Sequence, residues 1–171
     1  MGGRSVTLGL LDSLFGWDNP TIRWPIVEGA LPSVNRRAMQ FDPPRFGEPL
    51  EALRVFGRPD AFTWHNRAYK SAALQYRSAC LELEVEVGRF VAATYHLTQS
   101  SAFPLPGRPK APDGTMLTPD TRRRELIEIF GTPDRNGTDE ESMIIVHGET
   151  ASDFLFDEQG RLERWCIFLN D

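Results

Sequence analysis

Two nearly identical hexapeptides constrain the fold of this chain more than any other feature of its sequence. VFGRPD occupies residues 55–60 and IFGTPD occupies residues 129–134. An apolar pattern with helical spacing precedes each copy, and stretches rich in β-branched and aromatic residues follow it. Glycine ends a helix readily because it adopts positive φ at no steric cost, and proline cannot continue one. The sequence therefore predicts that one unit, a helix followed by strands, is used twice.

Both predicted helices carry recognisable start signals. The first is predicted to start at Pro49, because proline in the first helical position needs no hydrogen-bond acceptor. The second is predicted to start after an N-cap at Thr118, with Pro119 in its first turn. The buried stripes would consist of Leu50, Leu53 and Phe56 in the first helix, and of Leu126, Ile129 and Phe130 in the second.

Three strands are predicted after each helix. Residues 81–87, LELEVEV, alternate strictly, so their leucines and valines would face the core. Glu82, Glu84 and Glu86 would then line the opposite face of the sheet. The predicted strands are 73–78, 81–87 and 90–97 after the first helix, and 142–148, 152–157 and 161–169 after the second.

The predicted fold class is α+β. Two tandem repeats, each a helix with three or four antiparallel strands, would form one sheet or two adjoining sheets. A segment rich in proline and tryptophan precedes them, and we expect loops there with short extended pieces at 21–24 and 38–41. The predicted divisions are 1–46 for an N-terminal amphipathic helix and the Pro/Trp-rich segment packed on the core, 47–98 for the first repeat, 99–117 for a linker, and 118–171 for the second repeat.

Composition narrows the classes of partner. The 171 residues carry a net charge of −5, which argues against nucleic acid because phosphate binding needs a basic face. Cys80 and Cys166 lie in strand-like runs and are predicted to be buried apolar residues in a reducing compartment. No run approaches the roughly 20 apolar residues of a membrane span, and no secretory signal is recognised. The predicted location is the cytoplasm, without membrane attachment, and the oligomeric state stays open.

No catalytic or metal-binding motif is recognised in the sequence. The three histidines are far apart and lack the spacing of metal ligands. His96 and His147 fall in predicted strands and are interpreted as hydrogen-bonded sheet residues, whereas His65 lies in a predicted polar loop at 62–71. We therefore predict no metal and no cofactor. The sequence leaves open whether the chain is an enzyme and favours a non-catalytic role.

Six residues are candidates for binding a protein partner. Alternate residues of a strand are about 7 Å apart, so Glu82, Glu84 and Glu86 would form an acidic row that suits a basic partner. The alternative is an ordinary solvated sheet face. Trp24, Trp64 and His65 complete the candidate set, and the tryptophans could instead anchor their segments to the core.

The pattern over residues 47–171, with the hairpin FLFDEQGRLERW at 154–165, resembles the tandem α/β repeat of β-lactamase-inhibitor-protein-like folds, which are related to the SmpA/OmlA outer-membrane assembly lipoproteins. The resemblance implies a non-enzymatic module whose sheet or loops grip another protein. The chain departs from these groups in lacking the lipobox cysteine of the lipoproteins and the disulfide cysteines of the secreted inhibitors.

Three functional hypotheses follow. The leading one is a cytoplasmic protein-interaction module, such as an inhibitor or immunity-type partner of a bacterial effector. The alternative is a small-ligand-binding or hydrolytic domain, with a pocket between the repeats lined by Trp24, Trp64, His65 and Tyr69. The third is an assembly scaffold that an N-terminal helix ties to a membrane.

Overall fold

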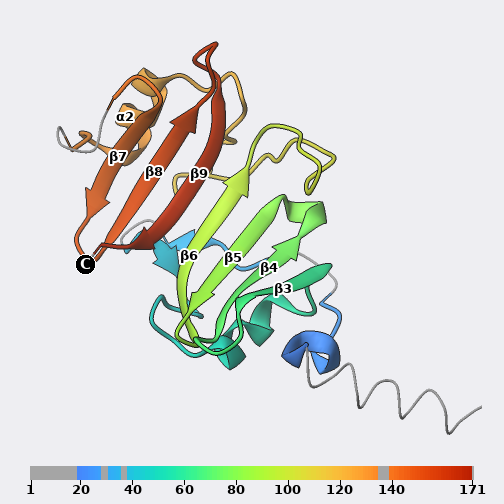
Figure 1. Ribbon diagram of the computed structural model, residues 1–171. Coiled ribbons are helices and arrows are strands. Elements are labelled where there is room, and N and C mark those ends of the chain that lie inside the picture. Colours follow the sequence, from blue (N-terminus) through green and yellow to red (C-terminus); the bar gives the residue numbers. More distant parts are fainter. Residues whose placement is uncertain (1–18, 28–30, 36–37, 135–138, 171) are drawn as a thin grey trace, which may run out of the picture.

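One antiparallel sheet of seven strands dominates the structure (Figure 1). The computed structural model describes residues 19–27, 31–35, 38–134 and 139–170. The strand order across the sheet is β3-β4-β5-β6-β9-β8-β7, so β6 and β9 join the two halves of the chain at its centre. The strands of this sheet are β3 (Ala61–Asn66), β4 (Ser71–Tyr76), β5 (Leu81–Glu86), β6 (Arg89–His96), β7 (Ser142–His147), β8 (Thr150–Phe156) and β9 (Leu162–Leu169).

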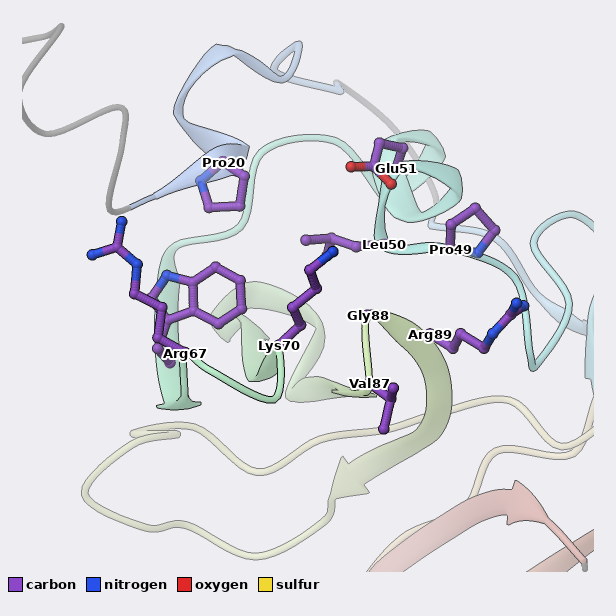
Figure 2. Close-up of a pocket in the computed structure, with 10 residues that line it drawn as sticks. Pro20, Pro49, Leu50, Glu51, Arg67, Lys70, Val87, Gly88 and Arg89 are labelled. Atoms are coloured by element: carbon purple, nitrogen blue, oxygen red, sulfur yellow. The ribbon is translucent and has the colours of Figure 1, made fainter.

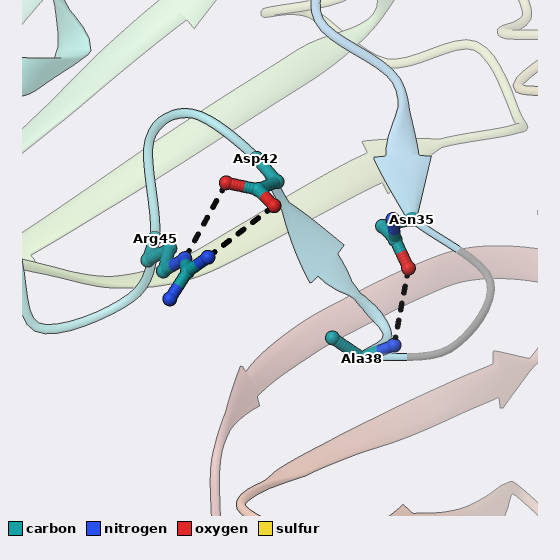
Figure 3. Close-up of polar contacts among 4 residues, drawn as sticks. All are labelled: Asn35, Ala38, Asp42 and Arg45. Atoms are coloured by element: carbon teal, nitrogen blue, oxygen red, sulfur yellow. Dashed lines mark hydrogen bonds and ion pairs between the residues drawn. The ribbon is translucent and has the colours of Figure 1, made fainter.

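Short elements surround this sheet. Strands β1 (Val34–Asn35) and β2 (Gln40–Phe41) form a separate antiparallel pair. Between these strands the Ala38 amide donates to Asn35 Oδ1, and after β2 Arg45 forms an ion pair with Asp42 (Figure 3). The helices of the described part are the 3-10 helices η1 (Pro20–Arg23), η2 (Leu50–Phe56) and η3 (Arg77–Ala79) and the α-helix α2 (Arg123–Phe130).

The buried core lies on one face of the large sheet. Leu81, Leu83 and Val85 of β5 are at most 1% exposed, which confirms the predicted alternation for these residues. Val87 was also predicted to face the core, but it lies in the turn after β5 and is 75% exposed. Leu53 of η2 and Leu126 of α2 are fully buried in the same cluster, so both helices cover this face. Helices therefore cover one face of the sheet, and the residues that alternate with the core residues, such as Glu82 and Glu84, form its other face.

Aromatic rings join the two halves of the core. Tyr95 of β6 stacks on Trp165 of β9, with 5.3 Å between ring centroids. Phe130, the last residue of α2, lies 5.3 Å from Trp165 and 4.9 Å from Phe154 of β8. Aromatic pairs at such distances add stabilisation beyond their buried area, so these rings hold α2 against the centre of the sheet.

The predicted fold class, α+β with two tandem helix–strand repeats, is wrong. The structure is mostly β: four strands follow η2, three follow α2, and all seven belong to one continuous sheet. The first predicted helix is a 3-10 helix, whereas the second is an α-helix. Gly57 and Gly131 end these helices with φ of 78° and 107°, which explains the similar sequences of the two hexapeptides. The hexapeptides therefore mark the same local turn rather than a copied unit.

Three local predictions also differ from the structure. The expected polar loop at 62–71 contains β3, an edge strand that pairs only with β4 and therefore shows no strong apolar alternation. The expected extended piece at 21–24 lies largely in η1, because Asn19 Oδ1 accepts from the Thr21 amide and caps that helix. The second helix begins at Arg123 rather than after the predicted N-cap Thr118, because Glu125 Oε2 accepts from the Arg122 amide and caps the helix there.

The segment 99–117, predicted as a linker, packs closely on one end of the sheet. Phe103 is 1% exposed, and its ring stacks on His96 with 4.2 Å between centroids. The Gly107 amide donates to the His96 carbonyl at 3.0 Å, and Leu117 is fully buried. These contacts fix the segment against the C-terminal end of β6.

The predicted amphipathic helix at the N-terminus lies outside the described residues. Within the described ranges, no helix has the length and apolar character needed to cross a membrane.

Candidate functional site

The sheet face opposite the core is the first candidate site, and we call it the outer face. Its members alternate with the core residues along each strand, and cross-strand pairing places them side by side. None of them belongs to the buried core cluster. The outer face consists of Ala61 and Thr63 of β3, Ala73 and Gln75 of β4, Glu82, Glu84 and Glu86 of β5, Ala92, Thr94 and His96 of β6, Arg164, Cys166 and Phe168 of β9, Ala151, Asp153 and Leu155 of β8, and Ser142, Ile144 and Val146 of β7.

The acidic residues of β5 lie on the outer face, as the alternation predicted. Gln75 Nε2 donates to Glu82 Oε2 at 2.8 Å, which holds this carboxylate toward β4. Burial raises the pKa of Glu84, and the neighbouring charges of Glu82 and Glu86 raise it further. The outer face therefore holds like charges close together at some electrostatic cost.

A polar row crosses the centre of the outer face. Thr94 pairs with Cys166, and Cys166 pairs with Asp153 on the next strand. Burial raises the pKa of the Cys166 thiol to about 11, and its hydrogen bond with Thr94 opposes this only in part. Burial also raises the pKa of Asp153, although Ser142 Oγ donates to its carboxylate at 3.1 Å. A thiol with so high a pKa stays protonated at neutral pH and is a poor nucleophile.

Apolar side chains occupy the outer face beside this polar row. Phe168 of β9, Leu155 of β8 and Ile144 of β7 are half-buried, and Val146 is 41% exposed. Small neighbours, Ala92 and Ala151, flank Phe168 in the paired strands. The Phe168 ring therefore protrudes above the two alanines beside it, and a complementary protein surface could pack around it.

His96 and Arg164 pair at one end of the outer face. Burial lowers the pKa of His96; the Glu82 charge raises it and the Arg164 charge lowers it, both to a smaller extent. Nε2 of His96 and Nε of Arg164 make no hydrogen bond within the described part of the chain. His96 and His147 lie in strands as predicted, but Nε2 of His147 also has no hydrogen-bond partner there.

The other three candidate residues lie in different places. His65 is exposed at an irregularity in the β3–β4 pairing, and its charge lowers the pKa of Glu84 from the outer-face side. Trp24 is partly buried against the core cluster, as the anchoring interpretation expected. Trp64 packs edge-on against Phe62, with 4.9 Å between ring centroids, and lines a separate cavity.

That cavity, of about 610 Å³, is the second candidate site and we call it the basic pocket (Figure 2). It lies at the turn between β5 and β6, so it does not separate two halves of the chain as the alternative hypothesis expected. Of the four residues named in that hypothesis, Trp64 alone lines it. The lining residues are Pro20, Pro49, Leu50, Glu51, Trp64, Arg67, Lys70, Val87, Gly88 and Arg89.

The described residues contain no group of three or more histidine, cysteine, aspartate or glutamate side chains placed to hold a metal ion. Sequence reasoning missed Thr94, Cys166 and Asp153 as neighbours of the glutamates. Alternation within each strand was available as a signal, but the pairing of β6 with β9 was not.

Comparisons with known proteins do not place the chain in a family. No family model matches it, and no curated protein matches it either. Among solved structures, it is similar to an extracellular protein containing a SCP domain from Bacillus anthracis str. Ames, with a TM-score of 0.42 and 11% sequence identity. The alignment covers 86% of this chain and 49% of that one, so the chain spans about half the length of this structural neighbour.

Proposed function

We propose that this protein is a protein-interaction module whose outer face binds a partner with basic side chains around an apolar centre. The observation that carries the proposal is the composition of that face. Phe168 lies two strands from Glu84 on the same face, with Ala92 between them, and the described helices pack on the opposite face. Protein interfaces combine an apolar, aromatic centre with a polar rim in this way.

The size of the outer face suits a single protein partner. Seven strands at about 4.8 Å spacing and a strand length of about 20 Å give a flat area of about 600 Å². A standard interface buries about 800 Å² on each partner, so the sheet face would supply most of such an area and its rim the rest.

Electrostatics favours a basic partner over an acidic one. The pKa of Glu84 is raised partly because Glu82 and Glu86 place negative charge beside it. A lysine or arginine of a partner would relieve this repulsion on binding, and such complementarity raises both association rate and specificity. More narrowly, we propose an inhibitor or immunity-type role, in which Glu82 and Glu84 of the outer face would bind basic residues of a target protein.

The test is capture of the partner followed by measured affinities. Wild-type protein and a Glu82→Lys/Glu84→Lys variant are used as baits, and a stoichiometric partner is identified and purified. Titration calorimetry at about 50 mM and about 300 mM salt then gives the affinities. We expect the variant to bind at least about tenfold more weakly at low salt, with a smaller difference at high salt.

The matched control is Glu149→Lys/Glu158→Lys, which makes the same charge change at exposed positions in two hairpin turns. This control should weaken binding by less than about threefold. A Phe168→Ala variant tests the apolar centre and should weaken binding without changing the salt dependence. Equal losses in the face variant and the control would refute the assignment of the outer face, and the absence of any stoichiometric partner would refute the proposed function.

A further inference from the structure

The floor of the basic pocket is built from three segments that are distant in the sequence. The Gly88 amide donates to the Lys70 carbonyl at 3.0 Å, and the Leu50 amide donates to the Gly88 carbonyl at 3.0 Å. Gly88 thus ties the β3–β4 turn to the start of η2. A side chain at Gly88 would meet the stem of Lys70, which lies across it at 3.3 Å. These bonds fix the pocket before any ligand arrives, which lowers the entropic cost of binding.

Positive charge is concentrated around this floor. Arg67, Lys70 and Arg89 line the pocket, whereas Glu51 is the one acidic residue among the lining residues described. The pocket therefore carries a net charge of +2 in a chain whose total is −5. Figure 2 shows Lys70 at the middle, with Arg67 on the side of Pro20 and Arg89 on the side of Pro49.

Two of the cations are positioned by contacts of the backbone. Arg89 Nη1 donates to the Gly47 carbonyl at 2.8 Å. The backbone of Arg89, the first residue of β6, also forms an isolated antiparallel β-bridge with Pro49. Lys70 has a φ of 50°, and its amide donates to the Arg67 carbonyl in the β3–β4 turn. Among the described residues, no carboxylate forms an ion pair with the Lys70 ammonium. Its charge is therefore available to a ligand.

Trp64 supplies an aromatic wall. Its ring is held edge-on against Phe62, with an interplanar angle of 88°, and it lines the same cavity as the three cations. A flat ring of a ligand can pack on an indole, and an adjacent anionic group can then reach lysine or arginine. The cavity of about 610 Å³ matches the size of sites that bind small molecules.

Val87 is a further sign that the pocket has a function. It lines the cavity, is 75% exposed and has a φ of 50°. A β-branched residue at positive φ is a conformational outlier, and glycine, asparagine or aspartate would fit the turn better. Such outliers gather at binding sites, because they are kept only where the side chain or backbone is needed.

We propose that the basic pocket binds a small anion with a flat aromatic ring, the ring against Trp64 and the phosphate or carboxylate at Lys70. The proposal is independent of the protein partner of the outer face. It requires both parts of the ligand, since Trp64 recognises the ring and Lys70, with Arg67 and Arg89 around it, recognises the charge.

The test is an NMR titration of the full-length, isotope-labelled protein with four probes. Adenosine 5′-monophosphate carries a ring and a phosphate, and indole-3-acetate carries a ring and a carboxylate. Adenosine alone and inorganic phosphate alone are the matched partial probes. We expect at least one of the two complete probes to shift the amides of Lys70, Val87 and Gly88, and to bind at least about tenfold more tightly than both partial probes.

Lys70→Met and Lys110→Met form a matched pair of variants, because Lys110 is an exposed lysine outside the pocket. The first should weaken binding at least about fivefold and the second should leave it unchanged. Raising the salt from about 50 to about 300 mM should also weaken binding of the wild-type protein, which tests the charge without any substitution. The proposal is overturned if neither complete probe shifts the pocket amides at about 10 mM, if phosphate or adenosine alone binds as tightly as the complete probes, or if both lysine variants behave alike.

Discussion

Replacing Val87 by asparagine should stabilise the protein, although it removes an apolar side chain. Val87 and Gly88 are the two residues between β5 and β6, and Glu86 pairs with Arg89 across the turn. Their φ values are 50° and 73°. Positive φ at both central residues is the mark of a type I′ turn, for which asparagine followed by glycine is preferred. Valine is disfavoured there because its Cβ crowds the following carbonyl oxygen.

The magnitude follows from two opposing terms. The left-handed conformation costs a residue with a Cβ about 1–2 kcal/mol, and asparagine tolerates it better than valine. Val87 is 75% exposed, so the substitution forfeits about a quarter of the roughly 2 kcal/mol that full burial of valine would contribute, or about 0.5 kcal/mol. The expected gain is about 0.5–1 kcal/mol. For a chain of this length that raises Tm by about 1–4 °C.

Thermal and urea unfolding followed by circular dichroism measure this effect. The control is Val146→Asn, since Val146 is also partly exposed but lies within β7. Asparagine is unfavourable in a strand, so the control should lower Tm. A Val87→Asn variant with unchanged or lower stability, and the same urea m-value as the wild type, would show that the turn does not strain valine.

Three further predictions concern single residues. The pKa of Glu84 is raised in the folded state, so ionisation of Glu84 destabilises the fold as the pH rises above the pKa of the unfolded chain. Glu84→Gln should therefore raise Tm at pH 7 and have no such effect near pH 4. Scanning calorimetry at both pH values would measure this difference. With a thiol pKa of about 11, Cys166 should be about 0.1% thiolate at pH 8 and should react with a disulfide reagent at least about tenfold more slowly than glutathione. Gly107→Ala should lower Tm strongly, because a Cβ there would clash with the His96 carbonyl oxygen and lie 2.8 Å from Cys80 Cβ; a variant of wild-type stability would contradict this packing.

The sequence predicts the local elements of this fold well and their arrangement poorly. Six strands of the large sheet and both main helix ends follow from alternation, apolar spacing and the two Gly-x-Pro turns. The pairing of Tyr95 with Trp165 does not, because no local pattern states which strands become neighbours. The edge strand β3 escaped prediction for a related reason: it has a partner on one side only, and Thr63 and His65 point to water.

The candidate site divides in the same way. Glu82 and Glu84 could be placed on one face from their spacing alone, and the structure puts them there. Cys166 and Asp153 of the same face come from strands about 70–80 residues later, so only the strand order β5-β6-β9-β8 brings them onto one surface with the glutamates. The prediction that Trp24 and Trp64 line one site was wrong: Trp64 lines the basic pocket, whereas Trp24 packs against the core, because two residues of the same type need not lie close together in the fold.

The net charge of the whole chain does not predict the local charge that a small ligand meets. The total of −5 argued against nucleic acid, yet the basic pocket carries +2 at one end of the β5–β6 hairpin. Electrostatic interactions in solution are screened beyond about 8 Å at physiological salt, so a small anion in the pocket responds to Lys70, Arg67 and Arg89 rather than to the whole chain. A long polyanion such as nucleic acid would experience the acidic surface as well and be repelled. The same hairpin therefore places Glu84 on the outer face and a cationic pocket beside its turn, so the two proposed ligands would not compete for one surface.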